Sequence, residues 1–329
     1  MNYGNSKVMV LGIVMCTFAL LWVASPVHGA ADLIPIYTPP AGGVVYVLGA
    51  GFATVSNKYS PEANYVHEAT TGTMEMVRRL RQKETQKRPA FALFATPDAP
   101  RAFKGEGEYG GKAFTALRAV AYVNSSDIYF VVPANSTIKS YADVKGKRIG
   151  VGSAGSTISN SAFFFFEQYG IKRTDFKVAL YNYKEVVEGI QNGSLDGGFL
   201  GGSYPMPSYM ELSLQHDVRI VPVDEKVLQK VTSAYPYYYR ALIKAKSYKG
   251  LENDTPIYGF TTTLWTHAGV STEMVYTFLK NLYEHRDDIY SIHKAAQKEF
   301  VLERLATPSS IPFHPGAEKY LKEIGALKK

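Results

Sequence analysis

Short apolar runs alternate along the chain with turns rich in Gly, Ser and Thr, and stretches with helical spacing follow many of these turns. Ala63–Ala69 and Phe91–Phe94 read as strands, and Met74–Lys83 carries apolar residues at the spacing of one helix face. A strand is also expected within 42–51, followed by a helix over Phe52–Tyr59. Successive strand–turn–helix units predict a parallel sheet whose C-terminal strand ends share one edge.

The same pattern returns in the middle of the chain. Leu117–Val123 and Ile128–Val132 are expected strands separated by the polar Asn124–Asp127, and the second strand is expected to enter another lobe. Ile149–Val151 should form a strand that leads through a Gly-rich turn into a helix over Ile158–Tyr169. The later expected elements are a strand, a helix, three strands and two helices (Phe176–Tyr181, Lys184–Gln191, Asp196–Leu200, Val218–Val223, Ile257–Thr263, Thr272–Tyr290 and Pro315–Gly325).

These elements predict an α/β protein of two lobes, each a mainly parallel sheet flanked by helices, with the second lobe inserted into the first. The expected first lobe is 31–130 plus 229–329, and the expected second lobe is 131–228. A chain of 329 residues is long enough to build two cores of this kind.

The N-terminal segment resembles an export signal. Lys7 precedes an uncharged apolar run, Val8–Val23, and Pro26 and small residues follow it. This pattern predicts a signal peptide over 1–30 with cleavage near residues 29–31 and a periplasmic location, and a retained membrane anchor is the alternative.

The composition limits the kinds of site and partner that we expect. Cys16 is the single cysteine and lies in the apolar run, so no disulfide or cysteine metal site is expected in the exported chain. The net charge of +7 is mild, and the basic cluster within Arg78–Arg88 is interrupted by Glu84. We interpret that cluster as a solvated helix face and expect no nucleic-acid partner.

Gly146–Thr157 is the most informative stretch for function. A strand, a Gly-rich turn with hydroxyls and a helix start favour an anion, because unpaired N–H groups and the positive end of the helix dipole lie there. The glycine spacing in this stretch also matches a dinucleotide-binding pattern. The acidic Asp175 precedes its strand rather than following it, so it would lie at the wrong sheet edge for a ribose. A purely structural turn remains an alternative.

Catalysis has weaker support. The 201–205 segment resembles a nucleophile elbow, but Pro205 stands where the second glycine belongs. The histidines are scattered and show no metal-binding spacing. We therefore expect no catalytic residue, cofactor or metal site, with a secreted α/β hydrolase-like enzyme as the alternative.

Binding is the favoured function. Hydroxyls and glycines at strand-to-helix turns suit a small carboxylate, with Tyr46 and Tyr204 as walls for a short aliphatic body. A cleft between two such lobes could close over its ligand.

Several motifs resemble the TAXI-type solute receptors of TRAP transporters, which are type II periplasmic binding proteins. The run Ile138–Gly152 (IKSYADVKGKRIGVG) is similar to a stretch shared widely among type II binding proteins. The turn Thr71–Glu75, the aromatic run Tyr235–Tyr238 and the C-terminal His314–Tyr320 (HPGAEKY) are more specific to the family. The resemblance spans nearly all of the chain after the signal.

The resemblance implies a monomeric receptor that captures a small organic acid or amino acid, glutamate- or dicarboxylate-like, and delivers it to TRAP membrane subunits. A ligand sensor subunit of a signalling system is a further alternative. The implied ligand-binding residues lie in five turns or strand ends (Tyr46, Thr71, Gly72, Thr73, Thr96, Asp98, Ser153, Gly155, Ser156, Thr157, Ser203 and Tyr204). The chain departs from the family pattern at Val45–Ala50, Thr73, Met76 and Thr96–Asp98, so the family's ligand does not transfer directly.

Overall fold

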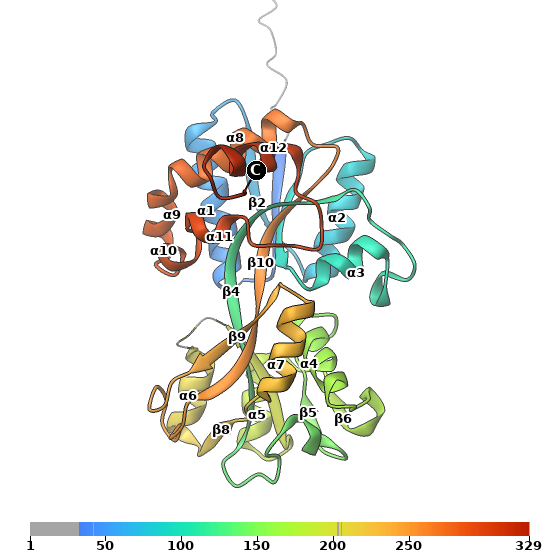
Figure 1. Ribbon diagram of the computed structural model, residues 1–329, viewed down its shortest axis with the longest axis vertical. Coiled ribbons are helices and arrows are strands. Elements are labelled where there is room, and N and C mark those ends of the chain that lie inside the picture. Colours follow the sequence, from blue (N-terminus) through green and yellow to red (C-terminus); the bar gives the residue numbers. More distant parts are fainter. Residues whose placement is uncertain (1–32, 42, 203, 205, 329) are drawn as a thin grey trace, which may run out of the picture. The chain divides into compact units, whose positions relative to one another are not determined.

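The computed structural model describes residues 33–41, 43–202, 204 and 206–328, all of which belong to one compact unit. The expected signal peptide and Cys16 lie outside these residues. Within the unit, ten strands form one sheet system in the order β2-β1-β3-β10-β4-β7-β5-β6, with β8 paired to β4 and β9 to β10. Two strands continue from one lobe into the other (Figure 1).

The first lobe is built on a central parallel arrangement of β1 (Leu33–Thr38), β2 (Asn64–Ala69) and β3 (Phe91–Ala95). Because successive strand residues point to opposite faces, Ile36 packs into one core and Tyr37 into another. One face is covered by α1, α8, α9 and α12, and the other by α2 and α3. The helices of this lobe are α1 Val44–Tyr59, α2 Thr73–Thr85, α3 Asp98–Lys104, η1 Gly107–Tyr109, α8 Thr272–Glu284, α9 Arg286–Ile292, α10 Ala296–Glu299, α11 Leu302–Leu305 and α12 Pro315–Glu323.

The second lobe contains the parallel strands β6, β5 and β7, flanked by helices on both faces. The strands are β5 Arg148–Gly150, β6 Lys177–Ala179, β7 Gly197–Gly202, β8 Val218–Ile220 and β9 Tyr238–Ile243. The helices are η2 Tyr141–Val144, α4 Thr157–Gln168, η3 Arg173–Asp175, α5 Tyr183–Gln191, α6 Pro207–Gln215 and α7 Glu225–Ala234. A capping box begins η2: the Ala142 backbone N–H donates to the Ser140 hydroxyl, and the Ser140 backbone N–H donates to the Asp143 carboxylate.

Two long antiparallel strands, β4 (Leu117–Pro133) and β10 (Thr255–His267), join the lobes (Figure 1). The prediction of two strands separated by Asn124–Asp127 was wrong. The register with β10 continues through this polar segment, from Thr262 opposite Asn124 to Gly259 opposite Asp127. Backbone pairing therefore holds the strand together where its side chains are polar.

The expected strand within 42–51 was also wrong. This segment is the first half of α1, and its buried residues Leu48, Phe52 and Val55 follow the three- and four-residue spacing of one helix face. The first strand is instead Leu33–Thr38.

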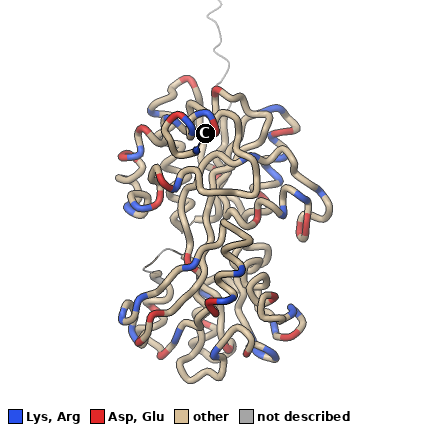
Figure 2. Tube along the Cα trace, viewed as in Figure 1, with Lys and Arg blue, Asp and Glu red and all other residues tan. Residues whose placement is uncertain are grey.

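Part of the segment that follows α7 packs with the elements of the second lobe. Tyr237, Tyr238 and Ile257 belong to its hydrophobic cores, although the sequence-based division gives 229–329 to the first lobe. Charged residues of both signs are interspersed over both lobes (Figure 2).

Candidate functional site

A cavity of about 280 Å³ lies where the two lobes meet. The first lobe contributes the start of α2 and the ends of β1 and β3, the second lobe contributes the β5–α4 turn, and β4 and β10 contribute residues at the crossing. Its lining residues are Pro39, Pro40, Val45, Thr71, Gly72, Thr73, Phe94, Ala95, Ser126, Ser153, Ala154, Gly155, Ser156, Thr157, Ile158, Tyr183, Gly201, Phe260 and Thr262.

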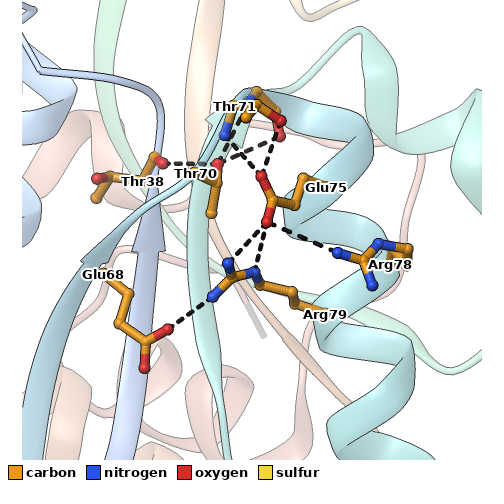
Figure 3. A network of polar contacts seen from close by, with 8 residues as sticks. Thr38, Glu68, Thr70, Thr71, Glu75, Arg78 and Arg79 are labelled. Carbon is orange, nitrogen blue, oxygen red and sulfur yellow. Dashed lines mark hydrogen bonds and ion pairs between the residues drawn. The ribbon is translucent and has the colours of Figure 1, made fainter.

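The first wall is the turn that leads into α2. The Thr70 hydroxyl donates to the carbonyl of Thr38 at 2.9 Å, which ties the turn to the end of β1 (Figure 3). Gly72 has a φ of 145°, a conformation that side chains rarely adopt, and its carbonyl accepts from the backbone N–H of Met76. No side chain of the described residues caps the N-terminus of α2, so its first N–H groups are available to a ligand.

Glu75 fixes this turn from within the helix. Its carboxylate accepts from the backbone N–H and the hydroxyl of Thr71, both at 2.8 Å, and pairs with Arg79 at 2.7 Å (Figure 3). The hydrogen bonds from Thr71, followed by that from Arg79, lower the pKa of Glu75 to about 2. The Thr71 hydroxyl therefore lines the cavity but is already committed to Glu75.

The second wall is the turn between β5 and α4. Ser156 caps α4, and its hydroxyl accepts from the backbone N–H of Ser159 at 3.2 Å. Ser153, Gly155 and Thr157 also line the cavity. The positive end of α4 thus faces the cavity from the second lobe, opposite the start of α2.

Two threonines have unused hydrogen-bonding capacity in this cavity. Thr73 is 6% exposed and Thr262 is 3% exposed, and neither hydroxyl bonds to another described residue. Within the described residues, each hydroxyl therefore keeps its donor and acceptor capacity for a polar group of a ligand in the cavity. Thr262 and the neighbouring Ser126 come from the crossing strands, and sequence reasoning missed them because they lie in mid-strand rather than at a turn.

Asp98 joins the two lobes beside the cavity. It is 1% exposed, and its carboxylate accepts from the Thr157 hydroxyl at 2.6 Å and from the Asn160 amide at 3.2 Å. Burial raises the pKa of Asp98, and the hydrogen bonds from Thr157 and Asn160 oppose that rise. Asp98 does not line the 280 Å³ cavity but a neighbouring one of about 790 Å³, which also contacts Gly155.

The remaining predicted site residues lie elsewhere. Tyr46 is in the first turn of α1, because the expected strand there is a helix. Its ring packs edge to face with that of His67, with the ring centroids 4.6 Å apart. Thr96 shares its hydroxyl with Thr261 and Thr263 at 2.8 Å each. Tyr204 is 51% exposed near Tyr248. Ser203 lies outside the described residues, as does Pro205.

The described residues also bear on the other kinds of site that the sequence raises, a ribose-binding acid and a metal cluster. Asp175 lies in η3 before β6, where its carboxylate accepts from the backbone N–H of Lys172, away from the cavity lining. Within the described residues, no group of three or more His, Cys, Asp or Glu could hold a metal ion. In the same part of the chain, no helix is long and apolar enough to cross a bilayer.

The chain matches one protein family in sequence and several solved structures in fold. The model of the NMT1-like family matches residues 36–325, which is most of the chain.

Solved structures share the architecture at low identity. XAC2383 from Xanthomonas citri, solved with ATP, is 11% identical with a TM-score of 0.55, over 90% of this chain and 96% of that one. A TctC solute binding protein from Polaromonas is 16% identical with a TM-score of 0.51, over 90% of this chain and 98% of that one. The fold is therefore the two-lobed α/β fold of type II periplasmic binding proteins.

Proposed function

We propose a function for this chain from one established premise: it belongs to the NMT1-like family. We infer that it is an extracytoplasmic receptor that binds a small organic acid between its lobes and delivers it to a membrane permease. The observation that supports this most is the cavity at the meeting of the lobes. Two helix N-termini converge there with two buried threonines whose hydroxyls have no partner among the described residues.

The binding mode follows from the walls of the cavity. An acidic group would accept hydrogen bonds from the first N–H groups of α2 or α4 and from the hydroxyls of Thr73 and Thr262. The apolar side chains of Val45, Phe94 and Phe260 would contact its hydrocarbon body.

We further propose that the chain is a TAXI-type receptor of a TRAP transporter. This finer proposal rests on the sequence motifs described above, and the permease would then be a TRAP membrane complex served by a monomeric receptor. The signal peptide over 1–30 and a periplasmic location belong to the same proposal. Genes for permease subunits beside this gene would favour transport over a sensor role.

We also propose lobe boundaries that follow the hydrophobic cores. The second lobe then comprises about 128–260, and the first lobe comprises the described residues on either side. Ligand release would require the lobes to separate about β4 and β10 and would break the contacts of Asp98 with Thr157 and Asn160.

A thermal-shift screen of the exported chain tests the function. Because a ligand that binds only the folded state raises the melting temperature, at least one small organic acid should raise it in a concentration-dependent manner. Sugars and simple amines of similar size serve as controls and should leave it unchanged. A shift with sugars or amines but with no acid would contradict the proposal.

A further inference from the structure

The cavity between the lobes has an uncharged lining over the residues that the structure describes. Among the described residues that form it there is no Asp, Glu, Lys, Arg or His. Its polar groups are hydroxyls, from Ser126, Thr73 and Thr262 among others, together with backbone groups.

Two carboxylates that accept hydrogen bonds from threonines of this lining lie outside it. Glu75 is held by Thr71 and Arg79, and Arg79 also pairs with Glu68 at 2.8 Å. Asp98 is held by Thr157 and Asn160. Each carboxylate therefore lies behind a threonine that lines the cavity, with its oxygens already hydrogen-bonded.

An α-ammonium group would be poorly accommodated in this cavity. Moving a charged ammonium out of water is costly unless an opposite charge meets it. Here it would meet hydroxyls and the positive ends of α2 and α4, which repel a cation. The same groups favour an anion, and the hydroxyls of Thr73 and Thr262 have no other described partner.

The available volume also limits the ligand. A cavity of about 280 Å³ lies close to the lower end of the roughly 300–1,000 Å³ that small-molecule sites occupy, which favours a small ligand. Part of its wall is apolar, from Val45, Phe94, Ile158 and Phe260.

From the function proposed above, we propose that this receptor selects small organic acids without an amino group and rejects the matching α-amino acids. The selected class includes short mono- and dicarboxylic acids and their 2-hydroxy derivatives. Selection arises because the cavity offers donors and positive helix ends for an acid but no carboxylate for an ammonium.

Calorimetric titration with near-isosteric pairs tests this selectivity. The pairs are lactate with alanine, malate with aspartate, and 2-hydroxyglutarate with glutamate, in which a hydroxyl replaces the ammonium at almost constant size. In the best-binding pair, the amino acid should bind at least tenfold more weakly than the hydroxy acid. Succinate and glutarate, which lack both groups, should bind within about tenfold of the hydroxy acids.

The outcomes separate the two proposals. An amino acid that binds as tightly as its hydroxy acid would overturn the selectivity and leave the receptor function standing. If no acid and no amino acid binds, the proposed function falls, and the selectivity falls with it. In Thr73→Val both members of a pair should weaken together, whereas a change in their ratio would show that Thr73 senses the ammonium position and would contradict the inference.

Discussion

Thr157 stands between the ligand cavity and the contact that joins the lobes. Its backbone begins α4 and its side chain lines the cavity, while its hydroxyl donates to the buried carboxylate of Asp98. The hydroxyl was expected from the sequence to bind the ligand directly. In the structure the hydroxyl donates a hydrogen bond to Asp98, which comes from the other lobe. No local sequence pattern reveals a partner 59 positions away.

Replacing Thr157 by Val should destabilise the ligand-free protein. The carboxylate of Asp98 would lose its shortest hydrogen bond and keep only the Asn160 amide, at a cost of about 1–3 kcal/mol in the free energy of unfolding. Urea denaturation measures this cost. Thr157→Ser keeps the hydroxyl and should recover most of the stability, so equal losses in both variants would show that the hydrogen bond is not the cause.

At the scale of elements, the strand–turn–helix units of the second lobe were largely predictable. The expected strands at 149–151 and 176–181 overlap β5 and β6, and the expected helix at 184–191 overlaps α5, because apolar spacing and caps there agree. The helix α1 was not predictable in full, since Val44–Gly51 is apolar almost throughout and fits a strand or a helix equally. Tertiary packing decided it.

The C-terminal HPGA motif is explained by packing rather than by ligand contact. The ring of His314 accepts from the backbone N–H of Gly316 through Nδ1, which caps α12, and its Nε2 donates to the carbonyl of Val270. Burial lowers the pKa of His314, in keeping with a neutral ring. Gly316 lies against α8, where an added Cβ would come within 2.1 Å of the carbonyl oxygen of Thr272.

Gly316→Ala should therefore force α12 away from α8. Overpacking of a tight contact costs about 1–3 kcal/mol, so the midpoint of urea unfolding should fall while ligand affinity at the distant cavity persists. Gly202→Ala is the matched control, because its added Cβ would meet only the Met206 side chain at 3.8 Å, an ordinary van der Waals distance. A control that loses as much stability as Gly316→Ala would refute the steric explanation.

The Glu75 carboxylate at the start of α2 should make the free energy of unfolding depend on pH. The pKa of Glu75 is lowered to about 2 in the folded state, so its contribution is complete above the ordinary value of 4.5 and is lost as the pH falls through about 2. The difference in unfolding free energy between wild type and Glu75→Gln should be largest at pH 6 and shrink towards pH 2. Urea titrations at several pH values measure it, with Glu211→Gln, exposed on α6, as the control. A difference that is constant with pH would rule out an electrostatic origin.

At the scale of the whole described unit, β4 and β10 connect the two lobes and also contribute lining residues to the cavity. Sequence reasoning anticipated a two-lobed α/β protein, and it identified most of the turn residues that line the cavity, such as Gly72, Ser153 and Ser156. It gave 229–260 to the first lobe and did not foresee that Tyr238 and Tyr258 pack on aromatic residues of α4, which lie far away in sequence. For the same reason it missed Thr262, whose importance depends on where β10 crosses the cleft.

The crossing is also braced by polar contacts. Glu299 of α10 accepts from the hydroxyls of Tyr122 and Ser125 on β4, and Tyr239 of β9 donates to Asp127 at 2.8 Å. These contacts hold the polar middle of β4 from both lobes. They explain why a segment that reads as a linker in the sequence is an ordered strand.

The most direct test is a calorimetric titration of the best acid from the screen against wild type, Thr73→Val and Thr262→Val. Each hydroxyl lies in the cavity without another described partner, so each variant should bind roughly tenfold or more weakly, since one hydrogen bond to a charged group is worth about 1.5–3 kcal/mol. Thr85→Val, which removes an exposed hydroxyl at the far end of α2, should bind as wild type does. Unchanged affinity in both cavity variants would contradict a ligand site between the lobes.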